Sequence, residues 1–190
     1  DAKLRERLRF ELIELQRQLG IPAVYVTHDQ TEAMVMSDRI LVMQSGLIAQ
    51  AGTPEDIYAR PANAFVADFI GLCNFVEAEV IGAAGEGCWQ VQSPLGTHDC
   101  VGDLPLTVGG RVTLMIRPER IALDVAPSAG SFTASVRRRY FLGAQTEYQL
   151  AVGDATLRAQ VTAAGAFPVD STVHLRIAPT DCRVVRRDEK

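Results

Sequence analysis

The sequence lacks the features that mark membrane-spanning, secreted and nucleic-acid-binding chains. It has no uninterrupted run of about 18 apolar residues, so we expect no membrane-spanning helix. Its first residues show no basic segment followed by an apolar one, so we expect no signal peptide. Neither part has a basic surplus, because residues 1–71 hold 7 Lys/Arg against 10 Asp/Glu (net −3) and residues 72–190 hold 12 against 13 (net −1). We therefore expect a soluble cytosolic chain that binds no nucleic acid.

Cysteine is sparse, and its spacing excludes a common kind of metal site. The chain has four cysteines, none of which forms a Cys-x-x-Cys pair. Together with His98 they do not give the ligand spacing of a zinc site, so we expect no bound metal. In a cytosolic chain such cysteines are most simply reduced thiols. They are Cys73, Cys88, Cys100 and Cys182.

Residues 1–71 contain the patterns of helices and strands in alternation. Leucines recur every three or four residues over 3–19 and predict an amphipathic helix. Residues 23–27 form a short apolar run that predicts a strand buried on both faces, as in parallel sheets. Residues 30–37 predict a short helix with Asp29 as its N-cap. His28 thus lies at the carboxyl end of a predicted strand, where open α/β sheets place their ligands.

The remaining elements of this part are signalled by their turns and caps. Thr53, followed by a proline and two acids, is a strong helix start. The predicted elements are strands over 39–44 and 47–50 joined by a Ser45-Gly46 turn, a helix from Pro54 to about Arg60, and a helix over 64–70 capped by Asn63.

After Gly71 the helical periodicity stops, and short β-type runs follow one another between Gly, Pro, Asp and Ser. This pattern is typical of a small all-β barrel or sandwich, with a domain boundary near 71–75. Residues 109–118 resemble residues 168–179 in having a polar lead-in, an alternating run and a proline, which suggests a duplicated half-barrel. The predicted strands cover 76–81, 88–92, 111–117, 121–125, 132–141, 146–152, 156–161, 172–178 and 182–185.

The motifs of residues 1–71 resemble those of one family. Val26-Thr27-His28-Asp29 is similar to the switch motif, or H-loop, of ATP-binding-cassette (ABC) nucleotide-binding domains. Asp1 and the residues after it resemble the end of that family's D-loop, and residues 38–54 resemble its closing hairpin and helix. The resemblance implies an α/β remnant over 1–71, the C-terminal third of a P-loop ABC ATPase domain.

Residues 72–190 resemble the transport-associated OB-like (TOBE) domain of importer ATPases. Arg117-Pro118-Glu119 is similar to its Arg-Pro-Glu motif, and residues 140–148 are similar to its Leu-Gly…Tyr strand pair. The resemblance implies an all-β OB-like regulatory domain in which Arg117 and Glu119 form a possible functional motif. An arginine at a strand end can also fix a corner by a charge-assisted hydrogen bond, so a structural role for Arg117 stays open.

The same resemblance gives roles to two residues of the first part. His28 is the implied catalytic switch residue that contacts the γ-phosphate and the attacking water, which suits phosphoryl transfer by positioned donors. Asp1 would lie at the dimer interface and relay nucleotide state across the two subunits. The full-length subunit would bind ATP and Mg²⁺. No Gly-x-x-x-x-Gly-Lys-Ser/Thr P-loop occurs in the 190 residues, so we expect a C-terminal fragment that binds no cofactor and is inactive alone.

The resemblance thus implies the ATP-binding subunit of an ABC importer for a small solute such as ferric iron, a polyamine, phosphonate or sulfate. Such a subunit forms a homodimer and binds transmembrane permease subunits. A periplasmic or extracellular solute-binding protein works with it indirectly. Its implied location is the cytoplasm, at the inner face of the cell membrane.

Other functions have less support in the sequence. The β domain could be a stand-alone module that binds a small oxyanion or dimerises, with residues 1–71 as an appendage. A hydrolase that uses His28 lacks a nucleophile partner, and His28, Asp29 and Glu32 do not have a known metal-ligand spacing. The strand over 23–27 lacks its usual neighbours, so we expect residues 1–71 to be partly disordered or paired with another chain.

Overall fold

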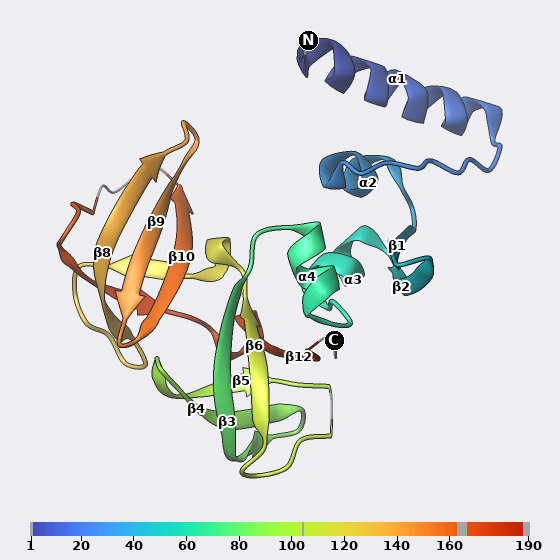
Figure 1. The fold of residues 1–190 in the computed structure, drawn as a ribbon. Helices are drawn as coiled ribbons and strands as arrows, with labels where there is room; N and C mark the ends of the chain where they lie inside the picture. The colour runs from blue at the N-terminus through green and yellow to red at the C-terminus, as the bar shows by residue number, and fades with distance from the viewer. Residues whose placement is uncertain (1, 104, 163–166, 188–190) are drawn as a thin grey trace. The chain divides into compact units, whose positions relative to one another are not determined.

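The structure is a computed structural model that describes residues 2–103, 105–162 and 167–187 (Figure 1). The chain divides into two compact units. The first comprises residues 1–62 and 66–71, and the second comprises residues 63–65 and 72–190. No helix in the described part of the chain has the length and apolar character needed to cross a bilayer.

Four helices and a hairpin are described for residues 2–71, and the sequence predicts all of them. Ser45 (φ 49°) and Gly46 (φ 83°) both have positive φ, as a two-residue hairpin turn requires. Thr53 Oγ1 accepts a hydrogen bond from the Asp56 N–H (3.2 Å) and so caps the helix that begins at Pro54. The elements are α1 (Ala2–Leu19), α2 (Gln30–Met36), β1 (Ile40–Gln44), β2 (Leu47–Gly52), α3 (Pro54–Ala59) and α4 (Ala64–Ile70).

The structure contradicts the prediction of a strand over residues 23–27. Residues 21–29 lie outside every helix and strand, and the side chains of Val24 and Val26 are 95% and 91% exposed. A parallel strand takes its hydrogen bonds and its apolar cover from neighbouring elements. No described strand pairs with this segment. Its apolar sequence is therefore not sufficient to produce a strand.

The second unit contains a closed five-stranded barrel and a five-stranded sheet (Figure 1). This confirms the all-β prediction for this part. The barrel has the order β12-β5-β4-β3-β6, and the sheet has the order β10-β9-β8-β11-β7. The strands are β3 (Asn74–Gly85), β4 (Cys88–Ser93), β5 (Gly96–Val101), β6 (Arg111–Ile116), β7 (Ala122–Asp124), β8 (Phe132–Phe141), β9 (Gln145–Val152), β10 (Ala155–Thr162), β11 (Thr172–Arg176) and β12 (Cys182–Val185).

The barrel takes its last strand, β12, from the chain that follows the sheet. Strand β6 of the barrel leads through the 3₁₀ helix Pro118–Arg120 into β7, which pairs with β11 of the sheet. Strand β11 leads through the 3₁₀ helix Pro179–Asp181 into β12, which pairs with β6 and β5 of the barrel. The two similar sequence segments thus end at equivalent points of the two halves. The chain thus leaves the barrel after β6, forms all five strands of the sheet, and returns to the barrel with β12. The barrel therefore cannot close without a strand that follows the sheet.

One hydrophobic core extends through both halves of the second unit. Leu114 of β6 and Tyr148 of β9 are completely buried within it. At the edge of the core, the Asn74 side chain donates from Nδ2 to the Arg158 carbonyl (2.8 Å) and accepts at Oδ1 from the Arg158 N–H (2.7 Å). Asn74 therefore supplies both hydrogen bonds that the N–H and carbonyl of Arg158 would otherwise make with a neighbouring strand.

Strand β5 is missing from the strands that the sequence predicts. Its residues, Gly-Thr-His-Asp-Cys-Val, are mostly polar or small and give no clear strand pattern. It forms because it pairs along its whole length with β4 and because Cys100 is completely buried. His98 of β5 also packs edge-on against Phe132, with ring centroids 5.5 Å apart.

Candidate functional site: the His28 turn

The turn that carries His28 is held by the residues on either side of it. Thr27 Oγ1 accepts a hydrogen bond from the Asp29 backbone N–H (2.9 Å). Asp29 Oδ1 accepts one from the Glu32 N–H (3.1 Å). Asp29 is therefore the N-cap of α2, as the sequence predicts. These two contacts order the backbone immediately before and after His28.

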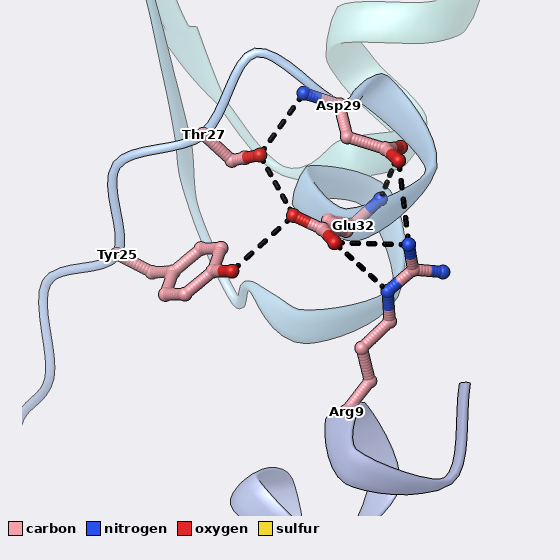
Figure 2. Close-up of polar contacts among 5 residues, drawn as sticks. All are labelled: Arg9, Tyr25, Thr27, Asp29 and Glu32. Atoms are coloured by element: carbon pink, nitrogen blue, oxygen red, sulfur yellow. Dashed lines mark hydrogen bonds and ion pairs between the residues drawn. The ribbon is translucent and has the colours of Figure 1, made fainter. Parts of the chain in front are cut away.

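Glu32 is the acceptor at the centre of a polar cluster. Its Oε2 accepts hydrogen bonds from Thr27 Oγ1 (2.8 Å) and Tyr25 Oη (3.2 Å). Its Oε1 accepts two from the Arg9 guanidinium, at Nη2 (2.9 Å) and Nε (3.2 Å). Arg9 Nη2 also lies 3.3 Å from Asp29 Oδ2. Figure 2 shows these five residues, here called the Glu32 cluster, which ties α1 to the start of α2.

The hydrogen bonds of the cluster favour the charged form of Glu32. The donation from Thr27, and next that from Arg9, lowers the pKa of the Glu32 carboxyl. The negative charge of Glu32 in turn raises the pKa of Tyr25. Only 17% of the Glu32 side chain is exposed, so its charge needs the guanidinium beside it. The carboxylates of Asp29 and Glu32 thus stabilise the turn through their hydrogen bonds.

His28 itself is exposed and is not one of the five residues of the Glu32 cluster. An imidazole can donate to or accept from a group that is brought to it, so His28 is suited to contact a ligand delivered from outside the unit. No three metal-ligating side chains in the described ranges are grouped so that they could hold an ion. Asp1, the other residue predicted for this site, lies outside the described residues.

Arg117 and Glu119, the predicted motif of the β domain, have different surroundings. The Arg117 guanidinium is buried at the end of β6 and donates from Nη1 to the Leu72 carbonyl (3.2 Å) and to Cys73 Sγ (2.8 Å). Glu119 is exposed in the 3₁₀ helix that follows. Arg117 thus holds the chain entering the barrel against the chain leaving β6. These contacts agree with the structural role that the sequence leaves open.

Sequence reasoning did not identify the partners that Glu32 has in other elements. Thr27 and Asp29 adjoin His28 and follow from the rules of helix capping. Arg9 lies in a separate helix, 23 residues before Glu32. The α1 pattern indicates only that Arg9 falls between leucines, as any solvated charge of an amphipathic helix would. The contact depends on how the 21–29 segment returns the chain toward α1.

Comparison with known proteins gives a consistent result for both parts of the chain. Residues 114–185 match the family model of the TOBE domain. The chain is 42% identical over 158 residues to the spermidine/putrescine import ATP-binding protein PotA 1 of Pseudomonas aeruginosa, an alignment that covers 83% of this chain and 42% of the relative. It is 41% identical over 180 residues to the Fe(3+) ions import ATP-binding protein FbpC 1 of Rhizobium meliloti, covering 94% and 47%.

A third relative aligns with the whole chain. The spermidine/putrescine import ATP-binding protein PotA of Acetivibrio thermocellus is 38% identical over 190 residues, which are 100% of this chain and 51% of the relative. The chain therefore spans about half the length of the curated relatives it matches.

Proposed function

Because the chain is homologous to ATP-binding subunits of ABC importers and contains a TOBE domain, we propose that it acts as part of such a subunit. The observation that supports this most directly is an identity of 38% to 42% with import ATP-binding proteins, over most or all of the 190 residues. Two of the relatives are named for spermidine/putrescine and one for Fe(3+). We propose a polyamine or ferric iron as the solute.

The domain assignment is part of this proposal. Residues 1–71 would be the end of the nucleotide-binding domain, and residues 72–190 would be the TOBE domain. The two compact units support this division, since they separate between Gly71 and Leu72 except for residues 63–65. Arg117 would maintain the start of the TOBE domain, and Glu119 would be the exposed member of its motif.

His28 would contact the γ-phosphate of ATP. Three features support this role: the side chain is exposed, the backbone on both sides is ordered by hydrogen bonds, and the nearby carboxylates are engaged elsewhere. A positioned donor that contacts charge developing in a transition state is the main source of catalysis in phosphoryl transfer. His28 would supply one such contact from this chain. Asp1 would lie at the dimer interface and relay nucleotide state across the two subunits.

ATP and Mg²⁺ fit the described residues only in part. Asp29 and Glu32 already accept hydrogen bonds from the Glu32 cluster, so they are poorly placed to ligate Mg²⁺. His28 can meet one phosphate group, but the 190 residues contain no P-loop to surround the others. We therefore propose that this chain alone does not hydrolyse ATP.

The partners follow from the same proposal. The subunit would pair with a second copy of itself and bind transmembrane permease subunits at the cytoplasmic face of the membrane. A solute-binding protein outside the membrane would deliver the solute to the permease. The TOBE domain would contribute to dimerisation or regulation.

A chimeric protein tests the proposed function. The part of the Acetivibrio relative that this chain does not match is joined to the 190 residues, and ATP hydrolysis is measured. We expect the chimera to hydrolyse ATP and His28→Ala to lower kcat by about 10²- to 10³-fold, the usual cost of removing one transition-state donor. His174→Ala is the matched control, because this histidine lies on β11 in the second unit, with its Nδ1 3.5 Å from Thr133 Oγ1.

Two results would contradict the proposal. One is a folded, active chimera whose kcat does not change in His28→Ala. The other is ATP hydrolysis by the 190-residue chain alone.

A further inference from the structure

Three polar side chains of the second unit lie in one row across neighbouring strands. Arg138 of β8 is paired with Gln149 of β9, and Gln149 is paired with Arg158 of β10. Neighbouring strands are roughly 4.8 Å apart, so the two arginines flank Gln149 at a Cα separation of roughly 10 Å. Two long guanidinium side chains at that spacing can converge on one small group above the amide.

A second row lies beside the first on the same face of the sheet. It consists of Tyr140, Glu147 and Gln160, again in register on β8, β9 and β10. Residues alternate along β9, where Thr146, Tyr148 and the other core residues are buried and those between them are not. The two rows therefore form a polar grid on the face opposite the core.

The positive charges of the grid are not neutralised by neighbouring carboxylates. Neither Arg138 nor Arg158 forms an ion pair within the described ranges. Glu147, the acid of the grid, instead accepts a hydrogen bond from Gln160 Nε2 (3.3 Å). Two guanidinium groups without an ion-pair partner and one carboxylate give the grid a net positive charge.

The grid is hollowed rather than flat. An open hollow of about 400 Å³ is lined by Arg138, Tyr140, Leu142, Glu147, Gln149 and Arg158. Arg138 Nη1 lies 3.4 Å from Tyr140 Oη, which acts as the acceptor, so the phenol proton remains available to a ligand. The donors of the first row and Tyr140 thus face a space the size of a small-molecule site.

We propose that this grid binds a phosphate-type anion, either inorganic phosphate or the phosphoryl group of a small phosphomonoester, between Arg138 and Arg158. Guanidinium groups match phosphate oxygens with paired hydrogen bonds. The Gln149 amide and the Tyr140 hydroxyl supply neutral donors between them. A hollow of about 400 Å³ exceeds the volume of a phosphate ion, so Leu142 has room to contact an organic group attached to it. The site uses only the second unit and does not depend on the proposed role in ATP hydrolysis.

Calorimetric titration of the 190-residue chain at low, constant ionic strength tests this site. Sodium phosphate and glycerol 3-phosphate are the two probes, with sodium chloride as the blank. We expect saturable binding at one site. Arg138→Gln and Arg158→Gln should each weaken binding about tenfold or more, as expected for loss of a charged hydrogen bond. Glu147→Gln should tighten binding a few-fold, because it removes a repelling charge.

Arg139→Gln is the matched control. Arg139 also lies on β8 and is exposed, but it is paired with buried Tyr148 and so belongs to the opposite face of the sheet. Unchanged affinity in this variant supports the site, and tighter binding of the ester would identify the phosphomonoester as the better ligand. The proposal fails if neither probe binds with a Kd below about 1 mM. It also fails if Arg139→Gln weakens binding as much as Arg138→Gln. Circular dichroism spectra establish that each variant is folded.

Discussion

At the scale of single residues, Glu32 contacts the chain on both sides of His28. Its carboxylate accepts hydrogen bonds from Thr27, Tyr25 and Arg9, and its backbone N–H is bound by Asp29. The neutral amide of glutamine would offer one acceptor oxygen in place of two and would repel donors at the other position. We expect Glu32→Gln to accelerate amide exchange at Glu32 and Ala33 about five- to tenfold, a change the size of one lost hydrogen bond.

The same contacts predict a pH dependence. The pKa of Glu32 is lowered in the folded state, so the stabilisation from its carboxylate is fully present above the ordinary glutamate pKa. It is lost as the pH falls through the lowered pKa, because protonation removes the acceptor that Thr27 and Arg9 use. Amide chemical shifts of residues 27–33, measured against pH, report this loss. Glu14→Gln, in exposed α1, is the control and should leave both measurements unchanged; equal effects of the two variants would argue against the cluster.

At the scale of elements, the return of the chain from the sheet to the barrel through β12 joins the two halves of the second unit. Strand β12 places Cys182, Val184 and Val185 in the interior, and it is the strand that closes the barrel between β6 and β5. Burying three such side chains contributes roughly 1.5–3 kcal/mol each. Their sum is comparable to the net stability of a typical domain, about 5–15 kcal/mol, so loss of this one strand should be enough to open the barrel.

Removal of residues 179–190 tests the role of β12. We expect the truncated chain to lose the barrel, and the thiol of Cys100 to become reactive toward a disulfide reagent. In the intact chain Cys100 is completely buried, and burial raises its pKa to about 11, so it should react orders of magnitude more slowly than an exposed thiol. Removal of only residues 188–190 is the control. A truncated chain in which Cys100 stays unreactive would show that the barrel closes without β12.

At the scale of the whole molecule, the two units differ in how much of their apolar surface is covered. The second unit has a continuous core. In the first, the leucines of α1 are about half exposed, and Val24 and Val26 are almost completely exposed. Segments with few buried contacts open more readily than core strands. We therefore expect the first unit to open more readily than the second.

Hydrogen exchange followed by mass spectrometry tests this difference. We expect amides of residues 23–27 to exchange at nearly unprotected rates at low protein concentration, and those of β6 and β9 to be protected by several orders of magnitude. Protection of 23–27 that rises with protein concentration would show pairing with a second chain. Protection that is high at every concentration would contradict the exposed arrangement of this segment.

Local patterns determined most of the secondary structure of this protein. The leucine spacing of α1, the caps Asp29 and Thr53, and the Ser45-Gly46 turn act through neighbouring residues, so the sequence alone identifies them. The alternating runs after Gly71 likewise predict a β domain. The family resemblance carried by Val26-Thr27-His28-Asp29 and Arg117-Pro118-Glu119 also comes from the sequence, and the relatives confirm it.

Only the tertiary structure decided the features that join distant residues. The 23–27 run has the composition of a buried strand but is exposed, because a strand in the middle of a sheet needs partners that no local pattern supplies. Strand β5 forms despite its polar sequence because β4 pairs with it. The partnership of Arg9 with Glu32 and the alignment of Arg138 with Arg158 depend on chain return and strand register. The spacing of residues along the sequence predicts neither this contact nor this alignment.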